Sequence, residues 1–82
     1  MNITYNEFEK AIQRLDLVVY WDKAAGELDL IGDGRIACIS TERKDVLEIS
    51  KNILKQFTPS EATTIRTLCL GLAGTPLEKR EL

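Results

Sequence analysis

The sequence predicts an α+β domain: an N-terminal helix, a three-stranded antiparallel β-meander and C-terminal helices, with the helices packed on one face of the sheet. Residues 17–41 support the meander, because they hold three short apolar runs separated by two glycine-bearing turns. Helical spacing of the apolar residues before and after this stretch supports the helices. A chain of 82 residues has room for one modest core, so we expect residues 1–82 to form a single small domain.

The first helix is expected from about residue 4 to residue 15. Thr4 and Glu7 have the spacing of a capping box, in which each side chain bonds the other residue's backbone N–H. The apolar positions that follow recur at helical spacing and should face the sheet: Tyr5, Phe8, Ile12 and Leu15.

The meander follows. Residues 17–21 are rich in β-branched and aromatic side chains, and Gly26 allows a turn after them. Residues 27–30 alternate carboxylates with leucines, which predicts a strand with one wet face and one dry face. Residues 32–34, Gly-Asp-Gly, turn the chain into a third strand over residues 35–40.

Residues 42–57 allow two interpretations. The spacing of Val46, Ile49, Ile53 and Phe57 fits one long helix. Alternatively, residues 46–49 run extended along the sheet edge, and Ser50 caps a short helix that ends at Phe57, because β-branched residues gather in the first half. We favour the split interpretation.

Two further helix starts carry proline at the first helical position. Thr58, Pro59 and Glu61 begin the main C-terminal helix, which should end near Gly74 in a left-handed cap. Its expected buried residues share one face: Ala62, Ile65, Leu68, Cys69 and Leu72. The same capping pattern at Thr75 predicts a short last helix.

Charge and composition restrict the function classes. Eleven basic and thirteen acidic residues nearly cancel, which argues against a dedicated nucleic-acid binder and against a dense negative DNA mimic. We expect a cytoplasmic protein without a leader or a membrane segment, because no long apolar run is present. Cys38 and Cys69 each lie between apolar neighbours, so both are expected to be free, buried and unreactive.

Catalytic chemistry has few candidates here. The chain has no histidine, and its cysteines have no metal-ligand spacing, so we expect no enzyme, no cofactor and no metal. Asp22, Glu27, Asp29 and Asp33 gather at the turns and on the outer face of the meander, where a divalent cation or an acid–base pair could use them. We interpret them as a solvated face that discourages strand-to-strand aggregation.

The adjacent aromatics Tyr20 and Trp21 suggest a protein-binding surface. Neighbouring strand residues point to opposite faces, so only one of the two can lie under the helices. The other would sit among carboxylates as an interface anchor, unless both are partly buried at the sheet edge. The candidate interaction residues are Tyr20, Trp21, Asp22, Glu27, Asp29, Asp33 and Arg35.

Residues 73–81, AGTPLEKRE, follow a Thr-Pro helix and resemble the ending of small uncharacterised proteins of temperate phages and prophages of Gram-positive bacteria, which often close on a YASTPIEERE-like run. The Ile36-Ala37 and Ile39-Ser40 pairs extend the similarity into the body. The chain departs from that family at residues 42–50 and at Leu72, where the family usually has an aromatic-acidic stretch and an aromatic residue. The resemblance implies an accessory protein of a phage or prophage.

Together these observations predict a non-enzymatic interaction protein that modulates or inhibits a host or phage protein, for example a defence system, through its sheet face. The alternatives are a nucleic-acid-associated accessory protein that uses scattered lysines and arginines, and a homodimeric structural protein. A homodimer would bury Tyr20, Trp21 or the surface of residues 68–74, where Gly71, Ala73 and Gly74 allow close approach.

Overall fold

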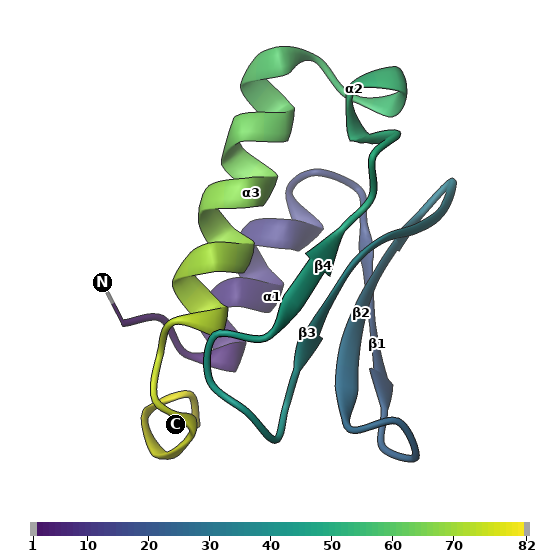
Figure 1. The fold of residues 1–82 in the computed structure, drawn as a ribbon. Helices are drawn as coiled ribbons and strands as arrows, with labels where there is room; N and C mark the ends of the chain where they lie inside the picture. The colour runs from purple at the N-terminus through teal and green to yellow at the C-terminus, as the bar shows by residue number, and fades with distance from the viewer. Residues whose placement is uncertain (1, 82) are drawn as a thin grey trace.

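The computed structural model describes residues 2–81, so the two ends of the expected 1–82 domain, Met1 and Leu82, lie outside the described residues. The elements follow in the order α1 (Tyr5–Gln13), β1 (Val18–Asp22), β2 (Glu27–Gly32), β3 (Gly34–Ser40), β4 (Leu47–Ile49), α2 (Ile53–Gln56), α3 (Pro59–Ala73) and the 3₁₀ turn η1 (Leu77–Lys79). Figure 1 shows two layers, with α1 and α3 side by side against one face of the sheet. The fold class is therefore α+β, as predicted.

The sheet has four antiparallel strands in the order β1-β2-β3-β4, so the prediction of a three-stranded meander was wrong by one strand. The missing strand is β4, whose three residues pair with Ala37, Cys38 and Ile39 of β3. Three residues are too few to show a period of two in the sequence. The split interpretation of residues 42–57 is confirmed by β4 and α2, but Ser50 does not cap the helix, since its Oγ accepts from the Asn52 N–H ahead of α2.

A β-bulge interrupts the pairing of β2 with β3. Leu30 pairs with Ala37 and Ile31 pairs with Arg35, which leaves Ile36 as the extra residue. Ile36 and Ala37 are both buried, although they are adjacent. The bulge thus keeps two consecutive apolar side chains in the core and leaves Arg35 exposed.

The two long helices begin as predicted. Thr4 and Glu7 form a reciprocal capping box at α1, and Thr58 and Glu61 form one at α3. Both helices bury an apolar stripe against the sheet, so the core lies between the layers. Its fully buried side chains include Phe8, Ile12, Leu28, Leu30, Ile36, Ile39, Ile53, Ile65, Cys69 and Leu72.

The C-terminal tail folds differently from the expectation. Gly74 ends α3 with φ −78°, so the left-handed cap was wrong. Thr75 does not cap the last turn: its hydroxyl donates to the Gly71 carbonyl at 2.7 Å and accepts from the Ile3 N–H at 2.9 Å. These bonds place Thr75 between Ile3, which precedes α1, and the end of α3, where Thr75 is fully buried.

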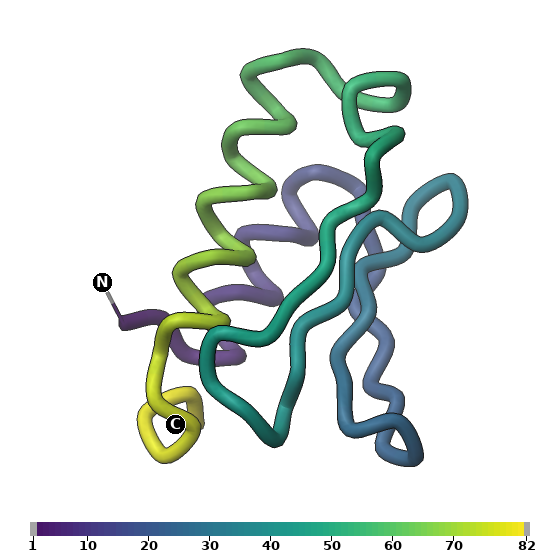
Figure 2. Tube along the Cα trace, in the orientation of Figure 1, coloured from purple at the N-terminus to yellow at the C-terminus, as the bar shows by residue number. Residues whose placement is uncertain are grey.

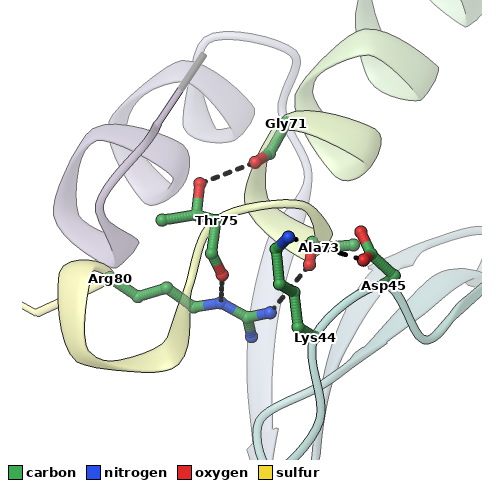
Figure 3. Close-up of polar contacts among 6 residues, drawn as sticks. All are labelled: Lys44, Asp45, Gly71, Ala73, Thr75 and Arg80. Atoms are coloured by element: carbon green, nitrogen blue, oxygen red, sulfur yellow. Dashed lines mark hydrogen bonds and ion pairs between the residues drawn. The ribbon is translucent and has the colours of Figure 1, made fainter.

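Arg80 is fully buried and organises this tail. Figure 3 shows its guanidinium pointing to the end of α3, with Nε donating to the Thr75 carbonyl at 3.0 Å and Nη2 to the Ala73 carbonyl at 3.0 Å. Nη1 donates to the Ser40 carbonyl at 2.7 Å, and the guanidinium carbon lies 5.9 Å from the centre of the Tyr5 ring. One cation therefore joins α1, β3 and α3, and it favourably meets the negative end of the α3 dipole.

The tube view shows the tail looping beside the start of α1 and the β3–β4 connection (Figure 2). The Tyr5 N–H donates to the Arg80 carbonyl, and the Asp45 N–H donates to the Ala73 carbonyl. Ala73 is buried, and a Cβ on Gly74 would meet Asp45 at 3.6 Å. The protein's own tail and β3–β4 connection thus occupy part of the 68–74 surface that was expected to meet a second copy.

Candidate functional site

The candidate site lies on the face of the sheet opposite α1 and α3, which we call the open face (Figure 1). Residues directly paired across strands share one face. Tyr20 pairs with Asp29, Asp29 with Cys38, and Cys38 with Glu48, so these four residues form one row across all four strands. We call this set the central row. The rows on either side carry Asp22, Glu27 and Ser40, and Val18, Ile31 and Arg35.

Asp29 is buried although it lies on the open face, with 7% of its surface exposed. The expectation of a fully solvated acidic face was therefore wrong at this position. Arg35 Nη1 donates to Glu27 Oε2 at 3.2 Å. Because Arg35 and Glu27 belong to the rows flanking the central row, their ion pair crosses over it and helps to cover Asp29.

One oxygen of this carboxylate has no partner. Asp29 Oδ1 is buried and makes no hydrogen bond with any group of residues 2–81. A buried polar atom without a partner costs about 1 to 3 kcal/mol, and more when it is charged. Asp29 is thus an energetically unfavourable residue at the centre of the open face, which suggests a functional role for the position.

The Asp29 carboxylate raises the pKa of neighbouring groups. Hydrogen bonding to Asp29 raises the pKa of Glu27, and burial and the Asp29 charge act in the same direction, while the Arg35 charge opposes them. Burial, followed by the charge of Glu27, raises the pKa of the Cys38 thiol. Two carboxyl groups and one thiol thus form a compact cluster in which negative charge accumulates unfavourably.

Cys38 differs from its expected environment. It is half-buried in the central row rather than buried, so that prediction was wrong for Cys38. Cys69 is fully buried on α3, and desolvation raises its pKa to about 12, as expected of an inert core thiol. Both cysteines are free. The difference arises because Cys38 faces away from the helices, which its apolar sequence neighbours do not reveal.

The two aromatics separate as predicted. Tyr20 lies on the open face and is 56% exposed, whereas Trp21 lies on the helix side and is still 38% exposed. Trp21 contacts the Tyr5 ring edge to face at 4.8 Å between centroids, and its Nε1 donates to Glu9 at 3.0 Å. Val18 adds a second exposed apolar side chain to the open face, at 62% exposure. Tyr20 and Val18 therefore supply the apolar part of the surface.

The remaining candidates divide between the face and its turns. The structure brings Tyr20, Glu27, Asp29 and Arg35 together on the open face. Asp22 accepts from the Ala25 N–H at 3.1 Å and so shapes the β1–β2 turn. Asp33 is exposed in the turn between β2 and β3. Cys38 and Glu48 were missed: Cys38 joins the row through the register of β2 with β3, and Glu48 joins it only through the pairing of β4 with β3.

The surface beside the central row is only shallowly indented. Hollows of about 160 Å³ and 300 Å³ flank Cys38 and Glu48. Sites for small organic ligands are usually enclosed and reach about 300 to 1,000 Å³. A broad, shallow face with an exposed aromatic fits a macromolecular partner better than a small metabolite.

Comparison with protein-family models, with curated proteins and with solved structures finds no significant match to this chain. Among the helices of residues 2–81, none combines the length and the apolar character needed to cross a bilayer.

Proposed function

We propose that this chain is a non-enzymatic accessory protein of a phage or prophage that binds a host or phage protein through the open face and thereby modulates or inhibits it. The proposal rests on one observation. The exposed apolar side chains of Tyr20 and Val18 lie beside the acidic central row on the open face, which α1 and α3 do not cover. Aromatic anchors surrounded by polar groups are typical of protein interfaces.

The charge of the open face narrows the partner's chemistry. Glu27, Asp29 and Glu48 lie on it, and Arg35 in a flanking row is already paired with Glu27. A complementary partner would present an apolar pocket for Tyr20 bordered by lysine or arginine. The possible targets within this class include a bacterial defence protein, as the resemblance of the tail implies.

Capture of binding proteins from a bacterial lysate, compared between matched variants, tests whether the open face is the binding surface. The wild-type protein should retain a partner that Tyr20→Ser loses and Leu70→Ser keeps, because Leu70 is similarly exposed, at 59%, on α3. Equal retention by both variants would place binding elsewhere. A circular dichroism spectrum of each variant confirms that it is folded.

The same experiment examines the two alternatives. A nucleic-acid-associated protein would retain nuclease-sensitive material whose binding weakens steeply with salt, because phosphate contacts release counterions. A homodimeric structural protein would sediment as a dimer near micromolar concentration and retain no partner. Either result would replace the proposal.

A further inference from the structure

Three metal-binding side chains converge in the middle of the open face. One carboxylate oxygen of Glu27, one of Asp29 and Sγ of Cys38 all lie within 4.8 Å of one another. Asp29 and Cys38 are directly paired on β2 and β3, and Glu27 precedes Asp29 by two residues on the same strand face. The backbone of two central strands therefore holds the cluster, and strands are a more rigid support than a loop.

Asp29 adds a separate indication that the cluster binds something positive. The residue is only 7% exposed, and its buried Oδ1 makes no hydrogen bond within the described chain. Buried carboxylates are normally paired with a cation, hydrogen-bonded or bound to metal. On the same face, Arg35 donates to Glu27 rather than to Asp29 Oδ1.

We infer that Glu27, Asp29 and Cys38 form a binding site for a divalent transition-metal ion, with Zn²⁺ as the best-matched cation. A sulfur ligand disfavours Mg²⁺ and Ca²⁺, which take oxygen ligands, whereas Zn²⁺ accepts both thiolate and carboxylate. Tetrahedral Zn²⁺ with bonds of about 2.0 to 2.3 Å needs ligand atoms about 3.3 to 3.7 Å apart. The three atoms now lie within 4.8 Å of one another, so they would have to move closer on binding.

Metal binding would change the charge of the cluster in a defined way. The Cys38 thiol loses its proton to solvent as the Zn–S bond forms, so binding releases one proton and strengthens as the pH rises. Zn²⁺ then offsets the charges of two carboxylates and one thiolate. Glu48, opposite Cys38 in register, borders the site with a further exposed carboxylate. This site would join β2 to β3, and it stands independently of the proposed protein partner.

The test is titration of the reduced protein with Zn²⁺ by calorimetry, together with Co²⁺ as a spectroscopic probe. The wild-type protein should bind one Zn²⁺, and its Co²⁺ complex should show a thiolate-to-metal charge-transfer band. Cys38→Ser and Asp29→Asn should each weaken Zn²⁺ binding at least about tenfold, since loss of an outer-shell partner alone costs about 10- to 100-fold. Glu27→Gln, at a more exposed position, serves if either variant fails to fold.

Two controls match these variants. Cys69→Ala removes the other thiol, and Asp33→Asn removes an exposed carboxylate outside the cluster. Both should bind Zn²⁺ like the wild type. The inference is overturned if the wild type binds no Zn²⁺ at millimolar metal, if binding survives Cys38→Ser and Asp29→Asn, or if the Co²⁺ complex lacks the thiolate band.

Discussion

Replacing the fully buried Arg80 by methionine should strongly destabilise this domain. The guanidinium makes three hydrogen bonds of 2.7 to 3.0 Å to the carbonyls of Ser40, Ala73 and Thr75. Methionine has a similar length but no donor, so it leaves these buried acceptors without Arg80. At about 1 to 3 kcal/mol for each unsatisfied acceptor, and with Ala73 still bonded to the Asp45 N–H, we expect a loss of about 3 to 5 kcal/mol.

That loss is large for a domain of 82 residues, whose total stability is expected to be about 4 to 12 kcal/mol. Urea unfolding followed by circular dichroism measures it, and the midpoint should fall by about 2 M or more. Lys79→Met, at an exposed neighbouring position, is the matched control and should leave the midpoint almost unchanged. Similar midpoints for the two variants would refute the assignment of Arg80 as the residue that holds the tail.

Three further predictions concern the helix cap, the thiols and the carboxyl pair. Thr58→Ala should lower the free energy of unfolding by about 1 kcal/mol in a urea titration, because the capping box of α3 is lost. In the native protein a maleimide reagent should label half-buried Cys38 well before Cys69, which is fully buried and has a pKa of about 12. Hydrogen bonding to Asp29 raises the pKa of Glu27 in the folded protein. Protonated Glu27 therefore stabilises the fold at low pH, and this contribution is lost as the pH rises through the raised pKa. With a chelator present, Glu27→Gln should therefore be more stable relative to the wild type at pH 7 than at pH 4.

Each of these predictions has a control. Lys55→Ala, at an exposed position on α2, should leave stability unchanged, and a loss equal to that of Thr58→Ala would contradict the cap. Equal labelling rates for Cys38 and Cys69 would contradict their assigned positions. Parallel pH profiles for the wild type and Glu27→Gln would show that the carboxyl pair does not couple to folding.

The fold could be predicted from the sequence wherever a local pattern extended over enough residues to be recognised. The capping boxes at Thr4 and Thr58 located both long helices, and the alternation of residues 27–30 located β2. Residues 46–49 were expected to run extended along the sheet edge but were not counted as a strand, because Leu47–Ile49 is too short to carry a period. Thr75 was misread as a cap because its hydroxyl bonds the Gly71 carbonyl and the Ile3 N–H, and the contact with Ile3, 72 residues away in the chain, is contained in no local pattern.

The site was predicted less completely than the fold. The opposite orientations of Tyr20 and Trp21 follow from strand geometry, and the structure confirms them. The burial of Asp29 could not be predicted, since it depends on the register that aligns Cys38 with it and on the Arg35–Glu27 pair crossing above. The burial of Arg80 was likewise not predicted, because a lysine–arginine run near a terminus gives no sign of burial.

Site-specific photo-crosslinking in bacterial cells tests most directly whether the open face is the binding surface. A photoreactive phenylalanine analogue replaces Tyr20 on the open face in one protein and Leu70 on the outer side of α3 in another, positions of similar exposure at 56% and 59%. We predict a specific protein adduct from position 20 and none from position 70. An adduct formed only from position 70, or none from either position, would contradict the account.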